Sequence, residues 1–128
     1  MGDFDHAPLP DTLYGYYDYR TDRIVLNDRL TERETRCTLA HERIHARDKD
    51  KPILDPWLNQ KRERLVEREA ACELITVEQM AEAIRWGDDP ATLCDQLDVD
   101  LPMLQARIDA LTQPEQEYLQ QIVRSKIA

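Results

Sequence analysis

The stretch LTERETRCTLAHERIHARD, residues 30–48, decides how the middle of this chain folds. Thr31 is followed three residues later by Glu34, which is the capping-box pattern of a helix N-terminus. An apolar stripe at helical spacing follows, made of Leu39, Ala40 and Ile44. The stretch therefore predicts a helix that begins near residue 31 and ends near Asp48.

Two histidines and a glutamate inside this helix form the pattern HExxH. His41 and His45 are four residues apart, so a helix directs both imidazoles to the same side. Glu42 stands beside the first histidine, where its carboxylate can reach a water on the metal without binding the metal itself. We predict that His41 and His45 bind zinc and that Glu42 is the general base of a hydrolase. The alternative is a structural or surface HExxH in an ordinary charged helix.

A catalytic zinc ion normally has three protein ligands, so a third ligand must come from elsewhere in the chain. The spacing HExxHxxGxxH does not supply it, because Asp48 and Lys51 occupy the glycine and histidine positions. The remaining histidine, His6, is far away in the N-terminal segment. We therefore expect a carboxylate from the acidic stretch KRERLVEREAACEL, residues 61–74.

Helical phase separates the glutamates of this acidic stretch. At about 100° per residue, one stripe collects the apolar side chains, namely Val66, Ala70, Leu74, Val77, Ala81 and Ile84. Glu63 projects onto the middle of the stripe, where its charge needs a compensating partner such as a cation. We predict Glu63 as the third zinc ligand and Glu67 as the acceptor for the free N–H of a ligating histidine. If both are instead exposed carboxylates paired with neighbouring arginines, Glu69 is the fallback ligand.

The whole pattern predicts an α+β fold that is predominantly helical. Residues 1–13 are interpreted as an extended arm, residues 14–28 as a short antiparallel hairpin, and residues 49–60 as a loop. One long or kinked helix is expected over residues 59–86. Two short helices with a tight turn at residues 98–100 should follow. The terminal helix is expected to start near Pro114, with Tyr118, Leu119, Ile122 and Val123 facing inward.

Two parts are expected along the chain. Residues 1–86 should form a core that carries the arm, the hairpin, the HExxH helix and the acidic helix. Residues 87–128 should form a helical extension packed on that core, with the shape of a helix-turn-helix. Its second helix offers Gln105 and Arg107 against Asp109, with further aspartates in the turn, which favours a structural or partner-binding role over DNA binding.

Composition limits where such a protein works and what it binds. The 128 residues carry a formal net charge of −9, which disfavours direct binding to nucleic acid. Three widely spaced cysteines without a CxxC pair are typical of reduced thiols in the cytosol. The sequence shows no secretory-signal pattern and no apolar run of membrane-spanning length, so we expect a cytoplasmic protein without a membrane partner. The oligomeric state is not predicted.

Several segments together resemble a known family, the small ImmA/IrrE metallopeptidases of phages, mobile elements and bacteria. The similar segments are GYYD at 15–18, RIVLND at 23–28, LAHERIH at 39–45 and EREAACELI at 67–75. The resemblance covers about residues 14–85. HExxH with Glu63 and Glu67 also resembles the gluzincin pattern, with Glu67 in place of the usual aspartate or asparagine.

The resemblance implies a short β-sheet edge beside the active-site helix, a zinc cofactor and limited proteolysis of a repressor-like transcription factor. An exposed edge strand could hold the substrate by main-chain hydrogen bonds. One of the hairpin tyrosines at positions 14, 16, 17 and 19 could stabilise an oxyanion, although cross-strand packing is their alternative role. The alternative function is a non-catalytic regulatory protein of the same fold that binds a repressor or another partner. The presence of Glu42 with both histidines favours the enzyme.

Overall fold

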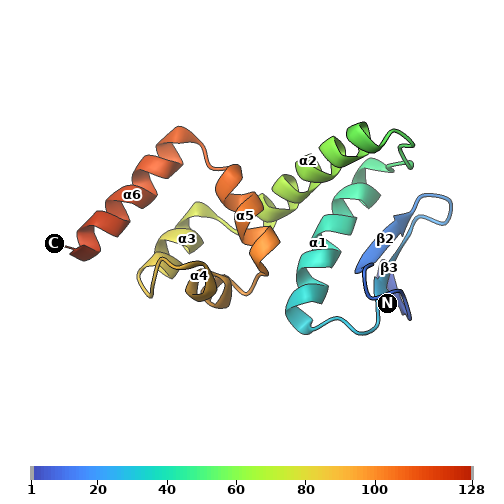
Figure 1. Ribbon diagram of the computed structural model, residues 1–128, viewed down its shortest axis with the longest axis horizontal. Coiled ribbons are helices and arrows are strands. Elements are labelled where there is room, and N and C mark those ends of the chain that lie inside the picture. Colours follow the sequence, from blue (N-terminus) through green and yellow to red (C-terminus); the bar gives the residue numbers. More distant parts are fainter. Residues whose placement is uncertain (1, 128) are drawn as a thin grey trace.

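The computed structural model describes residues 2–127, which form three strands and six helices (Figure 1). The sheet lies at one end of an elongated molecule, and α6 reaches the other end. In chain order the elements are β1 (Phe4–Ala7), β2 (Gly15–Asp18), β3 (Arg23–Asn27), α1 (Glu32–Asp48), α2 (Pro56–Leu74), α3 (Val77–Ile84), α4 (Pro90–Leu97), α5 (Leu101–Asp109) and α6 (Gln113–Ile127). The predicted fold class, α+β and predominantly helical, is confirmed.

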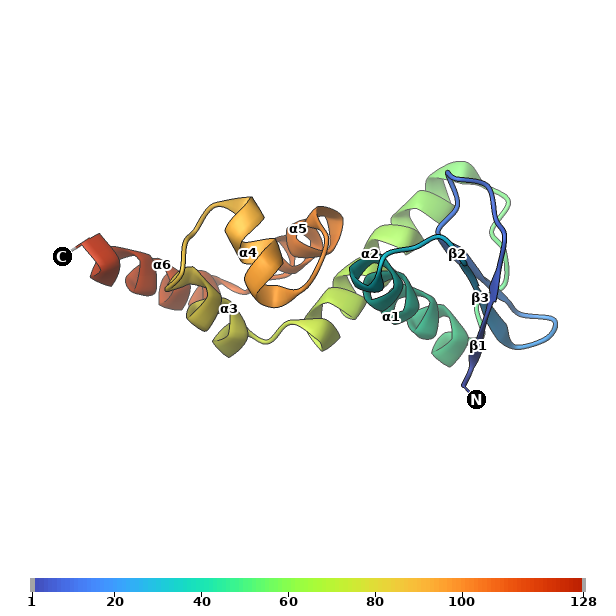
Figure 2. The same ribbon diagram turned by 90° about the horizontal axis from the view of Figure 1, so that it is seen from below.

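The sheet has the order β1-β3-β2, with β3 antiparallel to β2 and parallel to β1 (Figure 2). The predicted hairpin is therefore present, but the interpretation of residues 1–13 as an arm was wrong for residues 4–7, which form β1. The segment FDHA has no alternation that signals a strand, and its pairing with β3 is tertiary. An ion pair of 2.7 Å between Arg23 and Asp5 joins these two strands.

Helix α1 has the predicted boundaries and the predicted cap. The Thr31 side chain accepts a hydrogen bond from the backbone N–H of Glu34, whose carboxylate accepts one from the backbone N–H of Thr31. At the other end, Lys49 adopts the left-handed conformation, with φ of 54°. The helix lies between the sheet and α2 (Figures 1 and 2), so two of its faces are covered.

The expected long helix over residues 59–86 is instead two helices, and this prediction was wrong. Helix α2 begins earlier, at Pro56 after the N-cap Asp55, and it ends at Leu74. Ile75 and Thr76 are extended, and Thr76 forms a second capping box that starts α3. Both residues are β-branched, which disfavours a helix, and the Thr76 cap favours a new helix start over the continuation of α2. The apolar residues of α3 therefore do not extend the stripe of α2.

The C-terminal helices agree with the prediction in number and position. Aspartates cap α4 and α5, and Asp98 is left-handed in the turn between them. In α6, Leu119 is buried as expected, whereas Tyr118 is 42% exposed and does not face inward. Helix α5 packs on α2, and buried residues from α1 to α6 form a continuous hydrophobic cluster. The division of the chain at residue 86 stays a prediction.

Arg36 of α1 links this helix to the C-terminal extension by two hydrogen bonds to backbone oxygens at the end of α4 and in the α4–α5 turn. It donates to Leu97 at 3.1 Å and to Asp98 at 2.6 Å. None of the helices within residues 2–127 is long and apolar enough to cross a membrane.

Candidate metal centre

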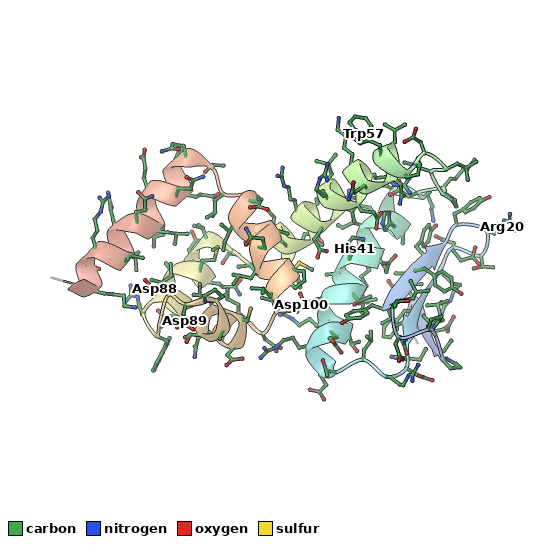
Figure 3. All side chains as sticks on the ribbon, in the orientation of Figure 1. Arg20, His41, Trp57, Asp88, Asp89 and Asp100 are labelled. Atoms are coloured by element: carbon green, nitrogen blue, oxygen red, sulfur yellow. The ribbon has the colours of Figure 1, made fainter. Side chains whose placement is uncertain are left out.

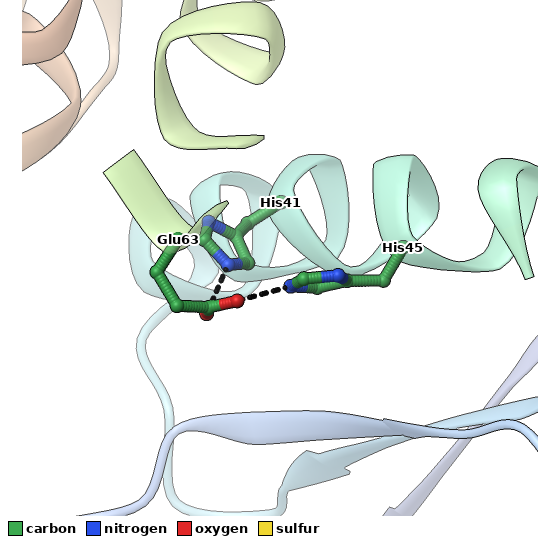
Figure 4. A group of neighbouring side chains, drawn as sticks. All are labelled: His41, His45 and Glu63. Atoms are coloured by element: carbon green, nitrogen blue, oxygen red, sulfur yellow. Dashed lines mark hydrogen bonds and ion pairs between the residues drawn. The ribbon is translucent and has the colours of Figure 1, made fainter. Parts of the chain in front are cut away.

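Two helices bring His41, His45 and Glu63 together, as Figure 4 shows. One ligand atom from each residue lies within 4.8 Å of the others. The Glu63 carboxylate stands between the imidazoles, 3.0 Å from Nε2 of His41 and 2.8 Å from Nε2 of His45. Two imidazole nitrogens and a carboxylate oxygen are a usual donor set for zinc, so the residues present fit such an ion.

The opposite ring nitrogens are also held by carboxylates. Nδ1 of His41 lies 2.7 Å from Glu67, and Nδ1 of His45 lies 2.8 Å from Asp50. An ionised carboxylate only accepts hydrogen bonds, so each Nδ1 carries the proton and donates it. With Nδ1 held in this way, Nε2 of each ring is the atom that would bind a metal, after it gives up the proton that it shares with Glu63.

Asp50 is the residue of this centre that the sequence reasoning missed. The left-handed Lys49 turns the chain back at the end of α1, and the Asp50 N–H then donates to the backbone oxygen of His45 at 3.0 Å. Arg62 of α2 fixes the same loop, because it donates to the Lys51 oxygen at 2.8 Å. The only available signal was an acid five residues after the second histidine. Its side-chain direction depends on a left-handed turn at a lysine, where glycine is usual.

The surroundings of Glu63 differ from the sequence-based expectation. Its side chain is 41% exposed and faces the histidines at the cleft, whereas Val66 and Ala70 enter the apolar core. Glu69 does not join the cluster and instead forms an ion pair with Arg47. Glu63 and not Glu69 is thus the neighbour of the histidines, as predicted, but its carboxylate is not buried in the apolar core.

The charges of the histidines and carboxylates in the cluster compensate one another. Burial lowers the pKa of His41, but hydrogen bonds to Glu63 and Glu67 outweigh it and raise this pKa to about 10. Burial also lowers the pKa of His45, but hydrogen bonds to Glu63 and Asp50 outweigh it and raise this pKa above its usual value. Burial raises the pKa of Glu63, yet the two histidines hold it well below its usual range. The centre is therefore arranged to accommodate positive charge.

Glu42 lies next to the cluster and is only 8% exposed. Burial raises the pKa of its carboxyl, against the opposing influence of His41 and His45. A carboxylate with a raised pKa is a better proton acceptor than an exposed one, which is the property that a general base needs.

Two hollows flank Glu42 along β2. The first, which we name the Tyr14 hollow, has a volume of about 220 Å³ and is lined by Tyr14, Gly15, Cys37, Thr38, Asp100 and Pro102 together with His41, Glu42 and Glu67. Figure 3 shows His41 on α1 and Asp100 where α5 begins. The second, the Arg62 hollow, has about 190 Å³ and is lined by Tyr16, Tyr17, Pro52, Asn59 and Arg62 together with Gly15, Glu42, His45, Asp50 and Glu63.

Gly15 belongs to both hollows because β2 passes very close to α1 at this point. A Cβ atom on Gly15 would lie 2.9 Å from the Val25 oxygen and 3.0 Å from Cγ2 of Thr38. Only glycine permits this approach. The edge of the sheet is thereby held against the helix that carries the histidines.

The tyrosines of the hairpin are not equivalent. The Tyr17 hydroxyl donates to Asp22 at 2.7 Å, which raises the pKa of Tyr17 to about 12. A hydrogen bond with Glu34 raises the pKa of Tyr14. Tyr19 stacks against Arg20 and does not line either hollow. Tyr16, 41% exposed and lining the Arg62 hollow, has no such acidic partner among the described residues.

Comparison with family models matches residues 6–109 to the peptidase family M78, described as the IrrE N-terminal-like domain. The chain belongs to this family. The match includes HExxH, Glu63, Glu67 and Asp50, and it continues through α5. Membership in M78 makes the chain a metallopeptidase-like protein. Searches of curated proteins and of solved structures gave no significant match.

Proposed function

We propose that this M78 protein is a zinc-dependent endopeptidase that makes limited cleavages in a protein substrate. The observation that carries the proposal is the position of Glu42. Its buried carboxylate adjoins the cluster of His41, His45 and Glu63, and it lies where the two hollows meet along an edge strand. A site for metal, a proton acceptor and space for a peptide thus coincide.

In this proposal His41, His45 and Glu63 hold the zinc ion. When bound, zinc would act as a Lewis acid, which lowers the pKa of a coordinated water and polarises a peptide carbonyl. Glu67 and Asp50 keep the imidazoles in the tautomer that presents Nε2. Glu42 accepts the proton of the attacking water and returns it to the leaving amine.

The edge strand β2 offers backbone groups to the substrate. Asn27 donates its N–H to the Tyr14 oxygen at 2.8 Å, which fixes the alternation of hydrogen bonds between β2 and β3. Gly15 and Tyr17 therefore direct their own N–H and C=O groups to the opposite, open edge. An extended peptide that pairs there would pass Glu42 and place neighbouring side chains in the two hollows.

The proposed substrate is a repressor-type transcription factor, encoded with this protein by a phage or mobile element, and the proposed location is the host cytoplasm. Membership in the IrrE-like family supports this choice. A substrate-restricted protease is also safer inside a cell than a general one.

The test is to incubate the purified, zinc-loaded protein with repressors encoded next to its gene and to map the products by mass spectrometry. We expect one or a few specific cuts, which the Glu42→Gln variant should not make. Specific binding of a repressor without any cut would favour the non-catalytic regulator instead.

A further inference from the structure

A groove between α2 and α5 extends the cleft beyond the two hollows. This α2–α5 groove has a volume of about 300 Å³. Its lining shares Glu67 and Pro102 with the Tyr14 hollow. The Tyr14 hollow in turn shares Gly15 and Glu42 with the Arg62 hollow. The Arg62 hollow, the Tyr14 hollow and the groove are therefore neighbours in this order along the molecule.

One wall of the groove carries two arginines, Arg64 and Arg68, which are exposed and one helical turn apart on α2. Lys61 precedes them by one turn on the same face, with its ammonium group 5.4 Å from the ring centre of Trp57. Figure 3 shows Trp57 at the N-terminal end of α2, on the outside of the molecule. The outer face of α2 is thus a row of cations that ends in an exposed aromatic ring.

The two arginines lack the carboxylate partners that most other arginines have. In a chain of −9 net charge, ion pairs within 4.0 Å occupy Arg23, Arg29, Arg33, Arg43, Arg47, Arg62, Arg85 and Arg107. Within residues 2–127, the guanidinium groups of Arg64 and Arg68 have no carboxylate oxygen within 4.0 Å and donate no hydrogen bond. They remain unpaired although the protein has 26 acidic residues.

Two acids, Glu67 and Asp109, also line the groove, and each already accepts a hydrogen bond from a neighbouring side chain. Glu67 accepts the Nδ1–H of His41, and Asp109 accepts a hydrogen bond from the Gln105 amide at 3.0 Å. A guanidinium group offers a fork of donors that matches a carboxylate. The groove therefore presents unoccupied donors to a ligand that brings its own carboxylates.

We propose that the α2–α5 groove binds an acidic segment of the substrate protein. This segment continues from the part of the substrate, on one side of the scissile bond, that occupies the Tyr14 hollow. This inference rests on the proposed function, because the bound segment belongs to the chain that is cut. Arg64 and Arg68 recognise its glutamates or aspartates, and they are residues of specificity outside the catalytic centre. The groove restricts cleavage to proteins that carry such a segment next to the cut site.

The test measures binding without requiring cleavage. The probe is a dye-labelled peptide of glutamate, alanine and leucine, and its control is the same peptide with glutamine at each glutamate. Fluorescence anisotropy with zinc-loaded Glu42→Gln protein should show binding of the acidic peptide that weakens as salt rises. The glutamine peptide should bind about tenfold more weakly, as expected for the loss of two or three exposed charge contacts.

The matched variants are Arg64→Gln/Arg68→Gln and Arg20→Gln/Arg124→Gln. The control arginines are exposed and lie outside the groove, in the β2–β3 turn and in α6. The first double variant should lose the preference for the acidic peptide, and the second should retain it. When a cognate repressor is the substrate, the Arg64→Gln/Arg68→Gln variant should have a higher KM and an unchanged kcat.

Three results would overturn the proposal: no binding of the acidic peptide, equal loss in both double variants, or tighter arginine-dependent binding of a single-stranded oligonucleotide. Failure of the proposed function is distinguishable from these. In that case no protein is cut, yet the acidic peptide still binds through Arg64 and Arg68.

Discussion

The Nδ1 atom of His45 lies 2.8 Å from a carboxylate oxygen of Asp50, a residue outside the helix that carries the histidine. This contact mirrors the 2.7 Å contact between His41 and Glu67. A carboxylate at Nδ1 thereby orients each imidazole. For His41 it comes from α2, and for His45 it comes from the turn that ends α1.

Replacing Asp50 by alanine should weaken zinc binding without removing any ligand. The loss is expected to be about 10- to 100-fold in affinity, because the ring of His45 loses its acceptor. Competition with a chromogenic chelator measures the change. Asp48→Ala is the matched control, since Asp48 is half-exposed and pairs with Arg47. Equal losses in the two variants would argue against the role of Asp50.

Glu42→Gln should keep its zinc and lose its activity. A positioned general base contributes about 100- to 10,000-fold to a rate, and glutamine cannot accept the proton. Product formation is measured with the cognate substrate, and metal content is measured on the same sample. Cleavage at the parental rate would show that another group accepts the proton.

Gly15→Ala should destabilise the fold and displace the edge strand. The added methyl group would meet the Val25 oxygen at 2.9 Å, and this atom belongs to the backbone and cannot rotate away. Overpacking of this kind costs about 1–3 kcal/mol in the free energy of unfolding. Denaturant unfolding provides the value. Gly2→Ala is the control, because its Cβ would meet its nearest atom at an ordinary 3.4 Å, and parental stability of Gly15→Ala would refute the close approach.

The three cysteines should differ in reactivity. Cys72 is exposed on α2, whereas Cys37 and Cys94 are buried. Burial raises the pKa of Cys37 to about 11, so at neutral pH little of the reactive thiolate forms. Iodoacetamide should modify Cys72 in the folded protein and all three cysteines after unfolding, as peptide mapping would show. Equally rapid labelling of Cys37 in the folded state would indicate that the hydrophobic core is not packed as described.

The local signals in the sequence predicted the elements near the site well. Thr31 and Glu34 set the start of α1, and the spacing of His41 and His45 placed both rings on one face. Glu63 and Glu67 were selected by helical phase, and they do contact the histidines. Helical phase separated Glu63 and Glu67 from Glu69 because all three residues lie within the regular helix α2.

Features that depend on tertiary pairing or on single backbone torsions were not predicted. Strand β1 exists through its partner β3, and Asp50 reaches His45 only because Lys49 is left-handed. The break at Ile75 and Thr76 had a readable capping box with Gln79, which the apolar stripe obscured. The reason given for Glu63 was also incomplete, since the residue faces the cleft and not the core.

Zinc content per chain, measured by plasma mass spectrometry after removal of loosely bound metal, tests the metal centre most directly. The parent protein should retain one zinc ion per chain, Glu63→Ala should lose it, and Glu69→Ala should behave as the parent does. Absence of zinc from the parent under loading conditions, or its loss in Glu69→Ala but not in Glu63→Ala, would contradict the assignment of His41, His45 and Glu63 as the ligands.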